Sequence, residues 1–157
     1  MGDCGRNRDG IPTATEAQEQ EWLFHWALLE SVKWPELRLM YHIPNEGKRS
    51  VRGGAAMKRQ GLRAGVPDIC LPVPRGGCHG LYIELKREHG GRISAEQTEW
   101  MERLTAQGYQ ASLCHGWRAA AEAIEQYMRG DRDEEQACEA QEDRAERGQK
   151  RELHTKA

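Results

Sequence analysis

The sequence predicts an α/β domain in which helices flank a central sheet of about four strands. Apolar residues recur at helical spacing in three segments, residues 16–32, 94–106 and 117–128. Short apolar and β-favouring runs are typical of strands and occupy residues 37–43, 69–73, 81–86 and 109–114. The expected order is therefore helix, three strands, helix, strand, helix.

The first helix begins after Thr13 or Thr15, because either threonine is a suitable N-cap. Its apolar residues are Trp22, Leu23, Trp26, Leu29 and Val32. Trp34-Pro35 ends the helix, since proline has no N–H to donate within a helix. The strand that follows closes in the turn Pro44-Asn45-Glu46-Gly47.

The second half of the domain has clearer boundaries. A short helix is expected at residues 55–62, and Pro72 and Pro74 indicate that the strand 69–73 ends at a margin of the sheet. Ser94 and Gln97 have the spacing of a capping box, which predicts where the second long helix begins. The residues of the last helix that are expected to face inward are Ala120, Ala123, Ile124 and Tyr127.

Composition indicates a single domain, because 157 residues with 38% hydrophobic content can form one core of ordinary size. We expect it to span residues 13–129, after a flexible arm at residues 1–12. Residues 130–157 contain nine acids and six basic residues, a charge of -3, and too few apolar side chains to form a core. They are expected to form a disordered tail.

Cysteine usage and hydropathy exclude two classes of protein. The five cysteines are an odd number without C-x-x-C spacing, which argues against a secreted disulfide framework and fits a reducing cytoplasm. No run approaches the roughly 18 apolar residues of a membrane span. The sequence thus predicts a soluble cytoplasmic protein with no membrane partner.

The strongest chemical signal lies at the ends of two predicted strands. Asp68 precedes one strand, and Glu84 and Lys86 share one face of the next, because side chains alternate along a strand. If the strands are neighbours, two carboxylates and a backbone carbonyl, that of Leu85, make a site for Mg²⁺ or Mn²⁺. Such a metal lowers the pKa of a bound water, and a lysine beside it can hold that water.

Each of these residues also has a purely structural interpretation. Asp68 after Pro67 is typical of a turn, and Glu84 with Lys86 is typical of an exposed ion pair on an edge strand. Gln97 fits the capping box without any further role. It is the joint order of these residues that favours a reactive site.

A carboxylate from the first helix is a further candidate for the site. Glu16, with Gln20, continues the helix stripe that contains Leu23 and faces the core. Glu19 competes with Glu16, because it lies on the adjoining face of the same helix. The sequence leaves the choice between the two open.

A basic stretch is the candidate surface for a partner that carries phosphates. Against Glu46 alone, residues 46–64 carry six basic side chains, a local charge of +5. They are Lys48, Arg49, Arg52, Lys58, Arg59 and Arg63. The pairs Cys78-His79 and Cys114-His115 suggest zinc only weakly, since adjacent strand residues point to opposite faces.

Taken together, these motifs resemble the VRR-NUC branch of the PD-(D/E)XK nucleases over residues 16–128. The residues that carry the resemblance are Glu16 with Gln20, His42 to Gly47, Gly65-Val66-Pro67-Asp68, Gly80 to Lys86, and Ser94 to Gln97. The resemblance implies a restriction-endonuclease-like fold with a central mixed sheet. It also implies that Asp68 and Glu84 bind the metal, that Lys86 is the catalytic lysine, and that Glu16 and Gln97 complete the site.

The leading hypothesis is a Mg²⁺- or Mn²⁺-dependent endonuclease that cuts branched DNA, of Holliday-junction or flap type. The resemblance further implies a stand-alone phage or prophage type, a homodimer, and a phage or host replication or repair protein as partner. Two alternatives stay open: a non-catalytic nucleic-acid-binding accessory module, and a nuclease that acts on RNA.

Overall fold

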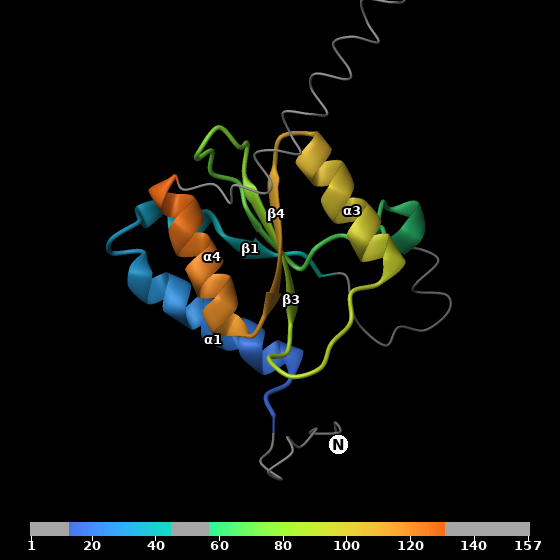
Figure 1. Ribbon diagram of the computed structural model, residues 1–157, viewed down its shortest axis with the longest axis horizontal. Helices are drawn as coiled ribbons and strands as arrows, with labels where there is room; N and C mark the ends of the chain where they lie inside the picture. Colours follow the sequence, from blue (N-terminus) through green and yellow to red (C-terminus); the bar gives the residue numbers. More distant parts are fainter. Residues whose placement is uncertain (1–12, 45–56, 131–157) are drawn as a thin grey trace, which may run out of the picture.

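The computed structural model describes residues 13–44 and 57–130 (Figure 1). Helix α1 (Glu16–Glu30) is followed by the 3₁₀ helix η1 (Pro35–Leu39), and residues 57–59 form one further helical turn. The strands are β1 (Tyr41–His42), β2 (Ile69–Leu71), β3 (Leu81–Lys86) and β4 (Gln110–His115). The two remaining helices are α3 (Ala95–Ala106) and α4 (Trp117–Arg129).

The four strands form one mixed sheet in the order β1-β2-β3-β4. The pairs β1–β2 and β2–β3 are antiparallel, whereas β3 and β4 are parallel. Parallel neighbours need a crossover, and α3 provides it. The predicted mixed sheet of four strands with flanking helices is confirmed.

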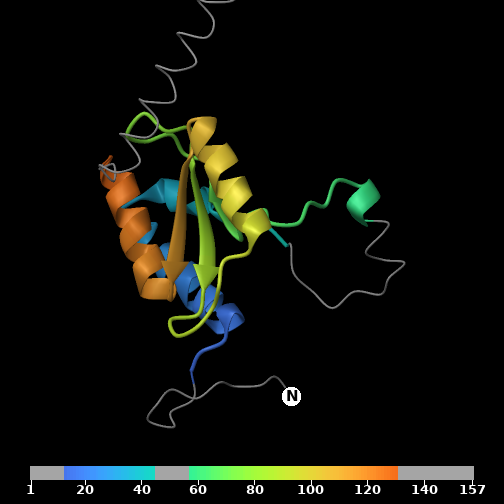
Figure 2. The same ribbon diagram turned by 45° about the vertical axis from the view of Figure 1, so that its right-hand side comes forward.

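Helices cover the two faces of the sheet unequally (Figures 1 and 2). Helices α1 and α4 pack together on one face, and α3 lies on the other. The core lies between the sheet and the α1–α4 pair, and its fully buried members include Leu23, Ile69, Leu71, Leu81, Ile83, Ile124 and Tyr127. Helix α3 has no fully buried residue. The α1–α4 face therefore supplies most of the hydrophobic stabilisation.

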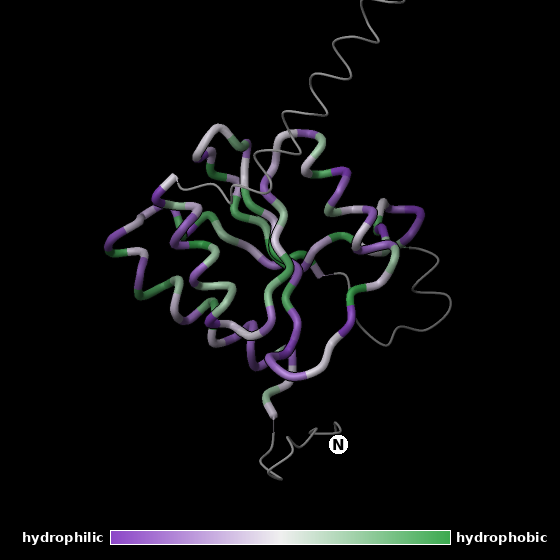
Figure 3. Tube along the Cα trace, in the orientation of Figure 1, coloured by the Kyte–Doolittle hydropathy of each residue, from purple (hydrophilic) through white to green (hydrophobic). Residues whose placement is uncertain are grey.

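Strand β3 separates the core from the polar site. Leu81, Ile83 and Leu85 enter the core, so the alternation of a strand directs Glu84 and Lys86 to the α3 face. Figure 3 shows the strands hydrophobic at the centre and hydrophilic toward the carboxyl ends of β3 and β4. Polar side chains thus gather where these two parallel strands end.

Most predicted boundaries agree with the structure, but the strand predicted at residues 37–43 is confirmed only at Tyr41–His42 and was wrong over residues 37–39. Pro35 begins a 3₁₀ helix there, and only Tyr41–His42 pair as a strand. The buried residues in this segment are Leu37 and Met40, three positions apart, which is the period of a 3₁₀ turn and not of a strand. The sequence resembles a strand in composition, whereas its burial follows the helical turn.

Other expectations were met in part. Trp26, Trp34 and Trp117 pack against the core, but Trp22 is 47% exposed, and Ala123 is only partly buried. The arm at residues 1–12, residues 131–157 of the predicted tail, and Lys48, Arg49 and Arg52 lie outside the described residues. No helix within the described ranges is long and apolar enough to cross a membrane.

Tyr127 gives a test of the core. Its hydroxyl donates to the backbone carbonyl of Val73, and burial raises the pKa of Tyr127 to about 12. Tyr127→Phe leaves that carbonyl without its donor, so we expect a loss of about 1 kcal/mol in the free energy of unfolding at pH 7. A raised tyrosine pKa stabilises the fold below the unfolded value near 10 and loses that effect toward 12. The difference between variant and wild type, measured by urea denaturation, should therefore shrink from pH 7 to pH 11; a constant or larger difference contradicts it.

Candidate active site

The pairing of β2 with β3 brings Asp68 to Glu84. Ile69 pairs with Ile83 in an antiparallel register, so the residue before Ile69 lies beside the residue after Ile83. The Oδ2 atom of Asp68 accepts a hydrogen bond from the backbone N–H of Leu85, 3.0 Å away. Asp68 is thereby fixed at the end of the ladder, half-buried, with its carboxylate toward β3.

Glu84 is a buried carboxylate with contacts on one oxygen only. Its Oε1 atom accepts hydrogen bonds from Lys86 Nζ, at 2.6 Å, and from Gln97 Nε2. Its Oε2 atom is buried and has no hydrogen-bond partner within the described part of the chain. A buried carboxylate oxygen without a donor is costly, unless a cation or a proton occupies the position next to it.

The electrostatics follow from this burial. Burial raises the pKa of Glu84 to about 7; the hydrogen bond from Lys86 lowers it, and the nearby charge of Asp68 raises it again. For Lys86, burial lowers the pKa, but the hydrogen bond and the charge of Glu84 more than compensate, and the charges of Glu16 and Asp68 add to them. The net shift of the Lys86 pKa is upward, so the lysine is charged at neutral pH.

Gln97 combines the two roles that the sequence suggested as alternatives. Its side-chain Oε1 atom accepts from the backbone N–H of Ser94 at 2.9 Å, and the backbone N–H of Gln97 donates to the Ser94 hydroxyl. The predicted capping box is thus confirmed. Because the cap occupies the amide oxygen, the amide nitrogen is directed to Glu84. The first turn of α3 is therefore joined to β3 through one side chain.

The structure distinguishes the two candidate carboxylates of α1. Glu19 is buried, and its Oε2 atom accepts from the backbone N–H of Trp117 at 2.9 Å. It thus caps α4, whose N-cap residue Gly116 has no side chain for the purpose. Glu16 is half-exposed and close enough for its charge to act on Lys86. Of the two, Glu16 is the carboxylate that remains available to the site.

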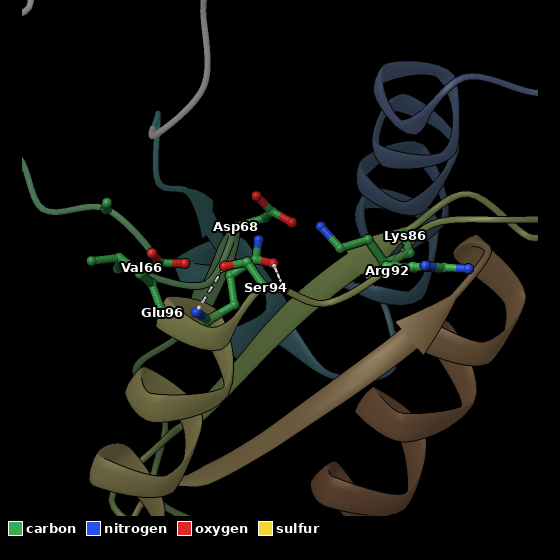
Figure 4. A pocket seen from close by; sticks show the side chains of 9 residues that line it. Val66, Asp68, Lys86, Arg92, Ser94 and Glu96 are labelled. Atoms are coloured by element: carbon green, nitrogen blue, oxygen red, sulfur yellow. Dashed lines mark hydrogen bonds between the residues drawn. The ribbon is translucent and has the colours of Figure 1, made fainter.

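A hollow of about 330 Å³ opens above Asp68 and Lys86 (Figure 4). Its lining residues are Ala64, Gly65, Val66, Asp68, Lys86, Arg92, Ser94, Glu96 and Gln97. Residues 64–66 form one wall of the hollow. The exposed side chains of Lys58, Arg59 and Arg63 lie in the segment that leads into this wall. Arg92 and Glu96 were not among the predicted site residues, because Arg92 is an isolated charge in a loop and Glu96 is an acidic residue in the first turn of α3, where the helix dipole alone accounts for it.

The donor set fits a hard divalent cation. Asp68, directly before β2, and Glu84, in the neighbouring strand β3, supply carboxylate oxygens. Leu85, between Glu84 and Lys86, adds a backbone carbonyl oxygen as a third possible ligand. The buried Oε2 atom of Glu84 is the position that a cation would satisfy. Among the described residues no three His, Cys, Asp or Glu side chains lie together so that they could hold a metal ion, so Glu16 does not join Asp68 and Glu84 as a third carboxylate ligand, and neither Cys-His pair belongs to such a group.

Comparison with known proteins identifies the family. The family model for the VRR-NUC domain matches residues 13–118, more than half of the chain. The chain belongs to the VRR-NUC family. A solved structure, a VRR-NUC domain protein, is similar to this chain at 28% sequence identity and a TM-score of 0.66, over 77% of this chain and 93% of that one. A comparison with the curated proteins finds no match.

Membership places the chain in a family of nucleases. Its four-stranded mixed sheet with flanking helices is the restriction-endonuclease-like fold of the VRR-NUC neighbour, as the sequence predicted. The VRR-NUC match covers every residue of the site described above, from Glu16 to Gln97.

Gly65 tests how the wall of the hollow is built. It has φ +82, and a Cβ atom there would lie 2.6 Å from the backbone carbonyl of Glu96, at the start of α3. Gly61 has φ +105 with nothing within 4 Å, so Gly61→Ala carries the backbone strain alone. We expect Gly65→Ala to lower the free energy of unfolding by about 1–3 kcal/mol more than Gly61→Ala, measured by urea denaturation. Equal losses would show that the close approach is not required.

Glu19 tests the contact between α1 and α4. Glu19→Ala removes the acceptor for the Trp117 N–H, so we expect a loss of about 1–2 kcal/mol in the free energy of unfolding. Glu19→Gln keeps an oxygen acceptor and should lose less. Glu21→Ala, at an exposed position of the same helix, is the matched control and should change stability little. If Glu19→Ala matches this control in a thermal melt, Glu19 does not cap α4.

Proposed function

We propose that this VRR-NUC domain is a Mg²⁺- or Mn²⁺-dependent endodeoxyribonuclease that hydrolyses phosphodiester bonds in branched DNA. The observation that carries the proposal is the buried carboxylate of Glu84, which has hydrogen-bond donors on only one of its two oxygens. Two donors hold one of its oxygens, and the other is buried without a partner among the described residues, next to Asp68. A cation held by Asp68 and Glu84 would account for this arrangement, whereas a purely structural ion pair does not require it.

The roles divide among the residues as follows. Asp68 and Glu84 would hold the metal, together with the carbonyl of Leu85. Lys86 and Gln97 fix the orientation of the Glu84 carboxylate. Lys86 would also hold the attacking water. Glu16 acts from α1 on the waters around the site.

The bound metal would supply a water of lowered pKa and neutralise charge on the phosphate. The protein holds the other reactants in place. Lys86 carries a positive charge at the floor of the hollow, where a phosphate oxygen enters, and α3 closes one side of it. Attack by an oriented water forms a new P–O bond and breaks the P–O bond to the leaving sugar oxygen. The water gives its proton to solvent or to Glu16, and the leaving oxygen takes a proton from solvent.

DNA is the proposed substrate because the hollow adjoins a basic segment. Lys58, Arg59 and Arg63 are exposed, and none of them forms an ion pair with a described residue. We propose that they contact phosphates together with Lys48, Arg49 and Arg52. Phosphate contacts position a nucleic acid without reading its sequence, so the structure of the DNA is the proposed basis of selection. A homodimer would present two such sites to a junction of matching two-fold symmetry.

The decisive experiment offers the protein and Mn²⁺ a labelled four-way junction, a flap and a plain duplex. We expect cleavage of the branched substrates, with Asp68→Asn, Glu84→Gln and Lys86→Met each slower by about a hundredfold or more, because the metal contributes several kcal/mol to the barrier. Glu102→Gln, on an exposed turn of α3, is the matched charge control and should cleave like wild type. Cleavage that persists in the site variants, or that needs no metal, contradicts the proposal.

Metal binding separates the enzyme from an accessory module. Titration calorimetry with Mn²⁺ should show binding to the wild type that weakens in Asp68→Asn and Glu84→Gln. An accessory module would bind DNA through the basic segment with no such dependence. The same oligonucleotides made as RNA test the third possibility, since phosphate contacts do not distinguish the two sugars.

A further inference from the structure

Arg92 is a cation at the rim of the hollow to which no role has been assigned. It lies in the loop between β3 and α3, its side chain is exposed, and it lines the hollow together with Asp68, Lys86 and Gln97. Within the described part of the chain, Arg92 forms no hydrogen bond or ion pair. A guanidinium without a partner, beside a hollow that also contains carboxylates, is available to an anionic ligand.

Lys86 and Arg92, the two basic residues that line the hollow, differ in how far their charge is available to a ligand. The Nζ atom of Lys86 lies 2.6 Å from Glu84, and the lysine is buried, so its charge is largely compensated within the protein. Arg92 has no such carboxylate partner among the described residues and faces solvent. Of these two side chains, only Arg92 brings an uncompensated positive charge to the rim.

The backbone fixes Arg92 beside Lys86. Gly91 has φ +136, and a Cβ atom there would lie 3.1 Å from Lys86 Cβ and 3.3 Å from Lys86 Cδ. The loop thus packs directly on the stem of the catalytic lysine, and the residue after Gly91 is held next to it. In Figure 4 the Lys86 ammonium points toward Asp68, whereas Arg92 extends to the other side, away from Asp68.

This placement gives the hollow a cation on each flank. The wall formed by residues 64–66 follows the exposed side chains of Lys58, Arg59 and Arg63, and Arg92 stands beyond Lys86 on the opposite flank. A polynucleotide strand carries a phosphate every few ångströms, so a strand whose reacting phosphate lies over Asp68 and Lys86 extends a neighbouring phosphate toward one flank or the other.

We propose that Arg92 binds a backbone phosphate next to the scissile one, on the Lys86 side of the site. The strand would run across the hollow from the 64–66 wall, over Asp68 and Lys86, to Arg92. The ligand is a phosphodiester of the substrate strand, held by paired N–H donors of the guanidinium. The inference rests on the proposed function for the position of the scissile phosphate.

The test measures binding without cleavage. A fluorescein-labelled four-way DNA junction is titrated with protein in Ca²⁺, and anisotropy is followed from low to moderate salt. Arg92→Ala should weaken binding by about five- to tenfold and reduce the slope of log affinity against log salt by about 1, because one phosphate contact is lost. Arg92→Lys should restore the slope but only part of the affinity, because an ammonium cannot pair two phosphate oxygens in one plane.

The matched control is Arg103→Ala. Arg103 is an exposed arginine of α3 that pairs with Glu99, and its removal changes the net charge by the same amount. It should leave the salt slope unchanged, and neither alanine variant should alter the melting temperature appreciably. In Mn²⁺, Arg92→Ala should raise KM more than it lowers kcat.

The outcomes separate this inference from the proposed function. If Arg92→Ala and Arg103→Ala lose equal affinity and slope, or neither loses any, the phosphate site at Arg92 is overturned. If the wild type binds the junction with the predicted Arg92 dependence but never cleaves it in Mn²⁺ or Mg²⁺, the phosphate site stands and the nuclease proposal fails. If the wild type does not bind the junction, both fail.

Discussion

The buried carboxylate of Glu84 is the constraint on which the site depends. A carboxylate with no exposed surface must be compensated, and the donors come from two directions: Lys86 on the same strand and Gln97 on α3. Each donor has a structural requirement of its own. Lys86 needs the two-residue period of β3, and Gln97 needs its capping box intact. The hydrogen bonds to one buried carboxylate therefore hold the start of α3 against β3 and fix the ends of the loop between them.

The asymmetry of the fold leaves room for this constraint. Helices α1 and α4 bury the apolar side of the sheet, whereas α3 contributes no fully buried residue on the other side. Buried ion pairs are poor sources of stability, because the desolvation of both charges offsets their attraction. The core can tolerate the Glu84–Lys86 pair since the stabilising burial takes place on the opposite face. Stability and the polar site are thus assigned to different faces of one sheet.

Local patterns in the sequence predicted the elements that local physics determines. Strand β3 and helix α3 have the predicted bounds, because alternation and a capping box act within a few residues. The strand predicted at residues 37–43 began too early, since apolar content alone does not separate a strand from a 3₁₀ turn. The role of Glu19 was beyond local reasoning, because its partner Trp117 is 98 positions away. Only the absence of a capping side chain at Gly116 indicated that α4 needs an acceptor from elsewhere.

The walls of the hollow show why site residues can be predicted more readily than the shape around them. Gly65 approaches the backbone of Glu96, and Gly91 approaches the stem of Lys86, each in a conformation that favours glycine. In both cases the backbone of a glycine makes the contact, and the pattern of apolar and polar side chains in the sequence does not predict such contacts. Yet they decide how far the residues that precede Gly65 lie from Asp68 and Glu84, and on which side of Lys86 the charge of Arg92 stands. The shared face of Glu84 and Lys86 follows from alternation along β3, whereas the path proposed for a bound strand depends on Gly65 and Gly91, which carry no chemistry themselves.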